Sequence, residues 1–274
     1  MKGERLMKSL DLNDVRNIGL NTLDYFAEIC SNYNFTYYLG YGTLLGAVRH
    51  GGFIPWDDDI DVWMPRKDFE ELIKLSSVIQ NDKYELKYID IEKSFSFLFA
   101  KLSRKDTVLL PSRFVNNTLY GCSIDVFPLD FFGNGLSYHQ AIIQHNEQRS
   151  SFQKQINHYH AYTDGKDIPT IKLLAKRIAY GLQSCISGPF YKKFVDYIGL
   201  YSHNEISDYY VIMGYTAVFK KEWFSTTKLM EFENKQYYVP YDYDSILTAI
   251  YGDYMKLPPK EEQIVPHSFK AYYL

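Results

Sequence analysis

Four aspartates stand within five positions of one another: Asp57, Asp58, Asp59 and Asp61. The last two belong to the alternating run Asp-Ile-Asp-Val-Trp-Met at 59–64. If this run is a strand, Asp59 and Asp61 point to one face, about 6.5–7 Å apart along the chain. Carboxylates this close repel one another unless a cation or a shared proton relieves them. Because oxygen ligands suit hard divalent ions, the pattern predicts a site for Mg²⁺ or Mn²⁺.

Two other interpretations of the acidic run are a solvated acidic loop and a calcium-binding loop. A calcium loop beginning at Asp57 would need Gly at its sixth position and Glu at its twelfth. The chain has Val62 and Asp68 there, which excludes this interpretation. The glycines that precede the aspartates argue against a plain acidic loop.

The segment before the aspartates predicts a site for anions. Residues 35–39 are aromatic and β-branched, which favours a strand. Gly40 and Gly42 then let the backbone turn tightly and approach a ligand. Thr43 is a good N-cap for a short helix ending at about Val48. The unpaired amides of such a helix start can bind phosphate, although an ordinary strand-to-helix turn has the same pattern.

A further aspartate and two cations are candidates for the same site. The stretch 121–127 predicts a strand ended by Pro128, in which Asp125 lies on the polar face. Alone, Asp125 would be an ordinary edge-strand charge. Lys101 and Arg104 come at the end of an aromatic strand predicted at 94–102. They are candidate phosphate contacts, with surface charges as the alternative.

The remaining patterns predict one compact unit with no Pro-, Gly- and Ser-rich linker. We expect a catalytic core at 1–136, a helical elaboration at 137–210 and a C-terminal part at 211–274 that packs back on the core. Apolar residues at helical spacing, turn residues and runs of β-formers indicate the elements. Helices are expected at 11–31, after Pro65, at 138–160, at 170–198 and from Asp242 or Asp244 to Tyr251, and a further strand at 84–89.

Composition limits the functional classes. The chain has 274 residues, 46% of them hydrophobic, and a net charge of −3, so no global field attracts nucleic acid. Its three distant cysteines form neither a disulfide framework nor a zinc spacing. The N-terminus lacks the apolar region of a signal peptide, and we expect a cytoplasmic protein. The basic, amphipathic segment 170–198 is either a core helix or a contact with the inner face of the membrane.

Three motifs together resemble those of the LicD family of phosphotransferases. The first is Gly-Thr-Leu-Leu-Gly-Ala-Val-Arg-His at 42–50, followed by Ile-Pro-Trp-Asp-Asp-Asp-Ile-Asp-Val at 54–62. The second is Ile-Asp-Val-Phe-Pro-Leu-Asp at 124–130. The third is Tyr-Gly-Asp-Tyr-Met at 251–255, with Leu-Pro-Pro at 257–259. This family is similar to fukutin and fukutin-related protein and belongs to the nucleotidyltransferase-fold superfamily.

The resemblance implies an α+β fold: a nucleotidyltransferase-like mixed β-sheet core with flanking helices and a helical elaboration. It implies that Asp59 and Asp61 are the metal pair and Asp125 the third carboxylate. Gly42-Thr43 stands where the superfamily usually has Gly-Ser, which keeps a hydroxyl. Fukutin-related protein also has a zinc site, but no cysteine–histidine cluster in this sequence supports one.

The resemblance also implies a function. Bacterial members transfer phosphocholine from CDP-choline to sugars of teichoic acid or lipopolysaccharide, and relatives transfer other headgroups from CDP-linked donors. We therefore expect a CDP-linked donor and a glycan acceptor that is lipid-linked. Arg49 and His50, between the two halves of the first motif, could cover the donor. Trp56 could stack on a base or shield choline, with plain packing as the alternative.

Three rival functions use the same residues differently. A nucleotidyltransferase would release pyrophosphate, whereas the phosphotransferase would release CMP. In a metal-dependent glycosyltransferase, the Asp-x-Asp motif usually follows about a hundred residues of nucleotide-binding strands and helices. Here the motif arrives at 59, after one predicted helix and one predicted strand. A non-catalytic sugar- or choline-binding module would use the tyrosines and would not need three metal-facing aspartates.

Overall fold

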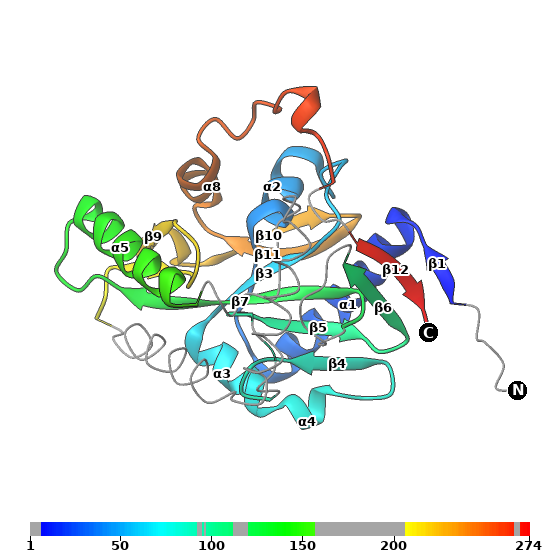
Figure 1. The fold of residues 1–274 in the computed structure, drawn as a ribbon. Coiled ribbons are helices and arrows are strands. Elements are labelled where there is room, and N and C mark those ends of the chain that lie inside the picture. The colour runs from blue at the N-terminus through cyan, green and yellow to red at the C-terminus, as the bar shows by residue number, and fades with distance from the viewer. Residues whose placement is uncertain (1–6, 92–94, 96, 112–119, 157–205, 266–268) are drawn as a thin grey trace, which may run out of the picture.

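The computed structural model describes residues 7–91, 95, 97–111, 120–156, 206–265 and 269–274 (Figure 1). Its centre is a mixed β-sheet, which confirms the α+β class. The strand order is β2 (Tyr38–Leu39), β3 (Asp61–Pro65), β7 (Ser123–Phe132), β5 (Ala100–Arg104) and β4 (Tyr84–Lys87). β3 and β7 are parallel and the other neighbours in this order are antiparallel. β8 (Tyr209–Val211) pairs with the far part of β7, and with β9 (Val218–Lys220).

Helices α1 (Leu12–Tyr33) and α3 (Arg66–Lys74) pack against the central strands of this sheet (Figure 1). α1 begins where predicted, because the Asp11 carboxylate accepts the N–H of Asp14 at its first turn. A Cβ at Gly19 of α1 would lie 3.2 Å from the Ile60 side chain. Ile60 therefore points toward α1, and Asp61, the next residue, points to the opposite face of the sheet.

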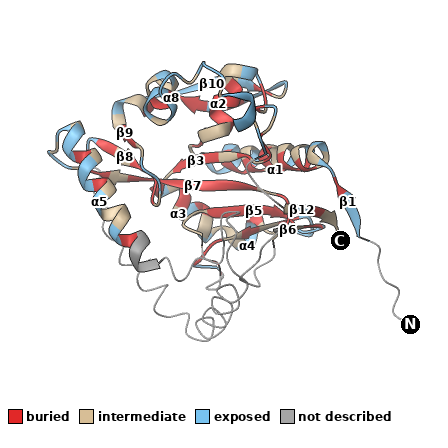
Figure 2. Ribbon diagram, turned by 45° about the horizontal axis from the view of Figure 1, so that its top comes forward, coloured by how far each residue is buried: buried red, intermediate tan, exposed pale blue. Residues whose placement is uncertain are grey.

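The opposite side of β3 carries the elements that enclose the site. They are α2 (Tyr41–His50), the 3-10 helix η1 (Lys221–Phe224), the hairpin of β10 (Thr227–Phe232) and β11 (Lys235–Pro240), and α8 (Tyr243–Tyr251). α2 packs against β3, β10 and α8, and β11 lies beside β2. Figure 2 shows β3, β7 and β5 buried over most of their lengths between these layers. The burial places the hydrophobic core on both faces of the central strands.

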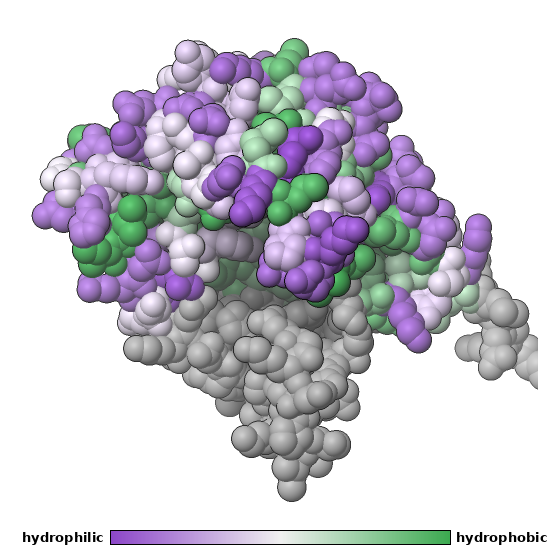
Figure 3. Space-filling model, turned by 90° about the horizontal axis from the view of Figure 1, so that it is seen from above, coloured by the Kyte–Doolittle hydropathy of each residue, from purple (hydrophilic) through white to green (hydrophobic). Residues whose placement is uncertain are grey.

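A second, three-stranded sheet joins the two ends of the chain. Its order is β1 (Lys8–Leu10), β12 (Phe269–Tyr273) and β6 (Thr107–Pro111), all antiparallel. The other described elements are α4 (Ser76–Ile79), α5 (Tyr138–Ile156) and the 3-10 helix η2 (Lys260–Glu262). On the face seen from above, hydrophilic and apolar side chains are intermixed (Figure 3). None of the helices within the described ranges is both long enough and apolar enough to cross a membrane.

Several predicted boundaries need correction around the first motif. β2 covers only 38–39 of the strand predicted at 35–39, and β3 begins at Asp61 instead of Asp59. α2 begins at Tyr41, with Gly40 at the N-cap, so Thr43 lies inside the helix. The Thr43 hydroxyl accepts the backbone N–H of Asp61 at 2.9 Å. It therefore ties the helix to the strand instead of capping the helix.

Pro128 does not end its strand, contrary to the prediction. Asp125 N donates to Ile60 O, so the odd-numbered amides of β7 point toward β3 and the even-numbered ones point away from it. On that second side, pairing with β5 stops at Val126 and pairing with β8 begins at Asp130. Pro128 occupies the gap, where no ladder partner requires its missing N–H.

The C-terminal helix was predicted correctly and the middle of the chain remains a prediction. Asp242 caps α8, Tyr251 is its last residue, and Gly252 follows in the left-handed region with φ +68°. α5 covers the described part of the helix expected at 138–160. The basic segment 170–198 lies outside the described residues. The division at 136 and 210 likewise stays a prediction.

The buried ion pair between α3 and β7 generates a stability prediction. The Arg66 guanidinium donates two hydrogen bonds to Asp130, at 2.6 and 2.8 Å, and the two side chains are 4% and 0% exposed. Asp130→Ala should lower the free energy of unfolding by about 3–5 kcal/mol, because it strands a buried cation. Urea unfolding of the variant measures this.

A matched pair of variants serves as the control. The double variant Arg66→Met with Asp130→Leu should recover most of the loss, since no buried charge remains. Glu71→Ala, which breaks the exposed pair with Lys74, should have a far smaller effect. Equal losses for Asp130→Ala and Glu71→Ala would contradict the assignment.

Candidate active site

Three charged side chains form a row across the central sheet. Asp61 of β3 is the register partner of Asp125 of β7, and Asp125 is the register partner of Lys101 of β5. Directly opposed residues on neighbouring strands share one face, so the sheet presents two carboxylates and an ammonium side by side. Lys101 Nζ lies 2.5 Å from Asp125 Oδ1. The structure thus brings together three residues that are distant in the sequence.

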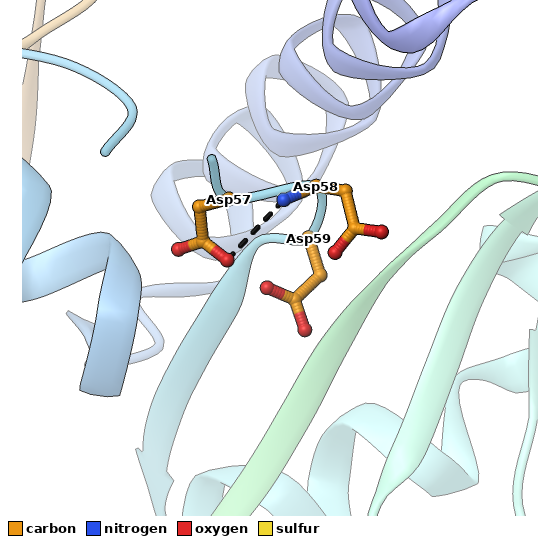
Figure 4. A group of neighbouring side chains, drawn as sticks. All are labelled: Asp57, Asp58 and Asp59. Atoms are coloured by element: carbon orange, nitrogen blue, oxygen red, sulfur yellow. Dashed lines mark hydrogen bonds between the residues drawn. The ribbon is translucent and has the colours of Figure 1, made fainter. Parts of the chain in front are cut away.

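Asp57, Asp58 and Asp59 form a second group on the loop that leads into β3 (Figure 4). One carboxylate oxygen from each lies within 4.8 Å of the other two. Asp58 N donates to Asp57 Oδ1 at 3.2 Å, and Asp57 and Asp58 are only 9% and 5% exposed. Within the described residues, these three carboxylates form the group that lies close enough together to hold a metal ion. Of the predicted metal ligands, this group contains Asp59 but not Asp61 or Asp125. Because all its donors are hard oxygens, it fits Mg²⁺ or Mn²⁺.

Two contacts hold the loop of this group in place. The Arg16 guanidinium of α1 donates to the carbonyls of Ile54, Pro55 and Asp57, at 2.6 to 3.0 Å. At Gly42 of α2, a Cβ would lie 2.6 Å from Asp57 Oδ2. A side chain at this position would displace the carboxylate, so the glycine is needed for close approach. Gly42 and Thr43 therefore position Asp57 and Asp61 directly, at the start of a helix whose first amides lack partners within the helix.

Burial and mutual repulsion raise the pKa of two of these carboxylates, Asp57 and Asp61. Burial, followed by the charge of Asp59, raises the pKa of Asp57 to about 8. Burial raises the pKa of Asp61 well above its usual value, and the charges of Asp59, Asp125 and Asp57 add to the rise, whereas Lys101 opposes it. A bound divalent cation would relieve this repulsion. The electrostatics of the site therefore favour cation binding.

Lys101 is a buried cation that remains charged. It is 7% exposed, and its Nζ lies 4.8 to 5.2 Å from the ring centres of Phe97, Phe99 and Tyr120. Burial, the largest single effect, lowers its pKa, but the charges of Asp125, Tyr120 and Asp59 and the hydrogen bond to Asp125 together raise the pKa overall. The prediction placed Lys101 among the phosphate contacts, and the structure does bring it to the carboxylates.

Arg104 is the predicted contact that the structure does not bring to the site. It lies three positions beyond Lys101 on β5, so its side chain is on the other face of the strand. Its guanidinium donates two hydrogen bonds to Asp106, at 2.9 and 2.5 Å. We therefore no longer assign Arg104 as a contact of the substrate phosphate. Its charge is instead neutralised by the local ion pair with Asp106.

Arg49 and His50 link the first motif to the third. Arg49 Nη1 donates to the carbonyl of Tyr254 at 2.7 Å, and its Nε donates to His50 Nε2 at 3.0 Å. Both residues lie in the last turn of α2, beside the segment that follows α8. Trp56 is partly buried against the hydrophobic core, which agrees with its packing alternative. A contact of Arg49, His50 or Trp56 with the donor stays a prediction.

Three tyrosines near the carboxylates were missed by the sequence reasoning. Tyr41 begins α2, Tyr215 follows Gly214 in a turn, and Tyr251 ends α8. Burial raises the pKa of each phenol, and the negative charge of Asp61 raises each of them further. Tyr251 stood in the third motif and Tyr41 beside Gly42, so both carried a signal. Tyr215 lies where no motif was placed.

The raised pKa of Asp57 predicts how stability depends on pH. The folded-state pKa of Asp57, about 8, lies above its ordinary value of 3.8, so the folded state binds more protons than the unfolded state between these pH values. In the presence of a metal chelator, the contribution of Asp57 to the free energy of unfolding should fall as pH rises from 4 to about 8. Mg²⁺ should raise the melting temperature more at pH 8 than at pH 5.5, because the ligands must be deprotonated.

The comparison variant is Asp57→Asn, which should flatten the fall with pH in thermal unfolding. Asp82→Asn, at an exposed position outside the site, should leave the profile of the unsubstituted protein intact. Identical profiles for Asp57→Asn and the unsubstituted chain would show that the pKa of Asp57 is not raised in the folded state.

Comparisons with known proteins agree with the geometry. The sequence model of a family described as "LicD/FKTN/FKRP, nucleotidyltransferase domain" matches residues 34–164. The chain is 30% identical over 290 aligned positions to the lipopolysaccharide cholinephosphotransferase LicD of Haemophilus influenzae, covering 98% of this chain and 100% of that protein. An uncharacterized protein of Rickettsia typhi is 31% identical over 115 residues, 39% of this chain and 37% of its own length. The near-complete alignment with the first of these shows that the chain belongs to the LicD family.

Proposed function

We propose that this protein transfers phosphocholine from CDP-choline, or a similar CDP-linked donor, to a sugar hydroxyl of a cell-surface glycan such as lipopolysaccharide or teichoic acid. The full-length relative is named a lipopolysaccharide cholinephosphotransferase, which supports the headgroup and the acceptor class. The observation that carries the proposal is the row of Asp61, Asp125 and Lys101 beside the carboxylates of Asp57–Asp59. Such a site suits a reaction that needs charge neutralisation and positioning.

The reaction is a phosphoryl transfer in line. The acceptor hydroxyl oxygen forms a bond to the phosphorus that carries choline, and the bond from this phosphorus to the CMP oxygen breaks. CMP leaves with the bond electrons, and the hydroxyl proton passes to a base. Mg²⁺ or Mn²⁺ held by Asp59 and Asp61 would neutralise charge on the donor diphosphate.

Asp125 and Lys101 act as a pair at the centre of the row. The Asp125 carboxylate accepts a hydrogen bond from the Lys101 ammonium, which fixes the orientation of the carboxylate. In this position Asp125 completes the metal ligands or takes the proton of the acceptor hydroxyl. Lys101 stays charged, so it also offsets negative charge gathered at the transferred phosphate.

Two alternatives use the same residues. A nucleotidyltransferase would release pyrophosphate, and a non-catalytic sugar- or choline-binding module would release nothing. Incubation with magnesium, a panel of CDP-linked donors and a glycan acceptor tests for CMP, and a parallel incubation with magnesium, CTP and phosphocholine tests for pyrophosphate. CMP release supports the proposal, whereas pyrophosphate overturns it. Contact of segment 170–198 with the inner face of the membrane remains a prediction, motivated by an acceptor that is lipid-linked.

Loss of either metal-pair carboxylate should abolish turnover. Asp59→Asn and Asp61→Asn each replace a charged ligand with a neutral amide, which is a weaker ligand for a hard cation. CMP release should fall to background while circular dichroism shows an intact fold. Asp82→Asn should retain full activity. Activity of Asp59→Asn or Asp61→Asn at the level of the unsubstituted enzyme would end the metal-pair hypothesis.

Asp125→Asn should reveal which role Asp125 plays. A lost metal ligand raises the magnesium concentration needed for half-maximal rate, and a lost base lowers the rate by roughly 10²–10⁴-fold. We expect both effects, because the carboxylate stands between Asp61 and Lys101. Asp106→Asn, at an aspartate paired with a cation outside the site, is the matched control. A magnesium titration of CMP release that gives the same curve for Asp125→Asn as for the unsubstituted enzyme would remove Asp125 from the site.

A further inference from the structure

On the face of the sheet that carries the carboxylates, the next pair of residues along β3 and β7 is aromatic. Trp63 and Phe127 lie two positions beyond Asp61 and Asp125 on β3 and β7, so they share the same face. They are register partners of each other, and Phe99 packs on Phe127 with ring centres 4.3 Å apart. An aromatic row therefore lies about 6.5–7 Å from the charged row, the spacing of alternate residues along a strand.

Two tyrosines stand on this aromatic row. Tyr41 meets Trp63 and Phe127 edge-on at 5.0 and 5.4 Å, and Tyr215 meets Phe127 edge-on at 5.4 Å. The rings of Tyr41 and Tyr215 stack at 4.8 Å with an interplanar angle of 30°. Tyr215 remains 37% exposed, so part of its ring is accessible to a ligand. Tyr251, from α8, is 41% exposed and lies within electrostatic range of both phenols.

The arrangement is held at an energetic cost. Tyr41 has φ +41°, which is uncommon for a residue other than glycine. Its hydroxyl is buried, and no hydrogen-bond partner for it exists in the described part of the chain. Unsatisfied buried groups and left-handed backbone are destabilising, and they gather at functional sites. Tyr41 therefore marks a place that is built for something other than stability.

A buried histidine fixes the backbone of Tyr215. His145 of α5 is 0% exposed, and its Nε2 donates to the carbonyl of Tyr215 at 2.7 Å. Burial lowers the pKa of His145 to about 4, so the ring is neutral and this donor is retained at neutral pH. Gly214, at φ +85°, permits the turn that presents Tyr215. The ring is thus positioned before any ligand arrives, which lowers the entropic cost of binding.

We infer that Tyr215, with Tyr41 and Tyr251, binds the quaternary ammonium end of the donor substrate, next to the carboxylates that handle its phosphate. This inference rests on the proposed function. Aromatic faces attract a cation through their negative quadrupole, and quaternary ammonium ions are bound in this way by sets of aromatic rings. The nearby carboxylates add Coulomb attraction for a cation, which a neutral nucleotide base would not gain. The ammonium group therefore fits this face better than the base does.

The test measures binding by the full chain without requiring turnover. Choline is titrated against its neutral isostere, 3,3-dimethylbutan-1-ol, and CMP is titrated separately, each followed by ligand-observed NMR. Choline should bind at least about tenfold more tightly than the alcohol, as expected for a partly desolvated cation–π site. Tyr215→Leu should weaken choline binding about tenfold and leave CMP binding unchanged. Tyr215→Phe, which keeps the aromatic face, should bind choline as the unsubstituted chain does.

Matched variants and a second readout separate the outcomes. Tyr238→Leu removes a tyrosine that is 40% exposed on β11 and packs edge-on against Tyr37; it should change neither affinity. If Tyr215→Leu fails to fold, Tyr251→Leu is titrated instead and should also weaken choline binding. Equal affinity for choline and the alcohol overturns the inference. Loss of CMP binding with choline binding intact also overturns it, because the ring would then stack on the base.

Kinetics distinguish failure of this inference from failure of the proposed function. If CDP-choline is turned over, Tyr215→Leu should raise its KM about tenfold with little change in kcat, since the contact is made equally in the ground and transition states. If no CDP-linked donor releases CMP, the proposed function fails, and the choline titration still decides whether the tyrosines bind the cation. An unchanged KM for CDP-choline in Tyr215→Leu overturns the inference.

Discussion

Repulsion among carboxylates is the constraint on which the rest of this site depends. Asp57, Asp58, Asp59, Asp61 and Asp125 are gathered around one end of β3 and β7, and burial strengthens every unfavourable pair. The described structure offsets this with fixed contacts. Lys101 pairs with Asp125, and the Arg16 guanidinium of α1 binds three carbonyls of the loop that carries the aspartates. The fold therefore stores an unfavourable charge arrangement that a cation would relieve.

The same loop is held from the C-terminal side. Glu233, between β10 and β11, accepts the N–H of Phe53 at 3.0 Å, and Arg49 donates to the carbonyl of Tyr254. Elements near 230 and 250 in the sequence thus close over a motif near 50. This explains why the third motif accompanies the first, although it contains none of the clustered carboxylates. The third motif lies against the first through the contact of Tyr254 with Arg49, and it contributes the aromatic side chain of Tyr251.

Local pattern was sufficient for the parts of the site that lie on strands. Strict alternation placed Asp61 on the polar face of one strand and Asp125 on the polar face of another, because each strand has a buried apolar face that fixes its orientation. The same alternation, applied past the predicted end of the strand at 102, would have placed Arg104 opposite to Lys101. Pro128 was misjudged because a proline is harmless where a strand changes partners, and partner changes are not visible in one sequence. The N-cap was misplaced by three residues, at Thr43, since Gly40 caps the helix instead.

Tertiary contacts decide the parts that the sequence could not predict. The hydrogen bond from His145 to Tyr215 spans 70 residues, and among 26 tyrosines no periodicity distinguishes the three near Asp61. The match to the family model ends at 164, so it contains the carboxylates and Tyr41 but neither Tyr215 nor Tyr251. The proposed phosphate chemistry therefore rests on short, local motifs, whereas the surface proposed for the headgroup is assembled from three distant elements. Under this proposal, a substitution in those elements would change which headgroup is accepted and leave the carboxylates in place, because the two rows of the sheet are adjacent but carry different side chains.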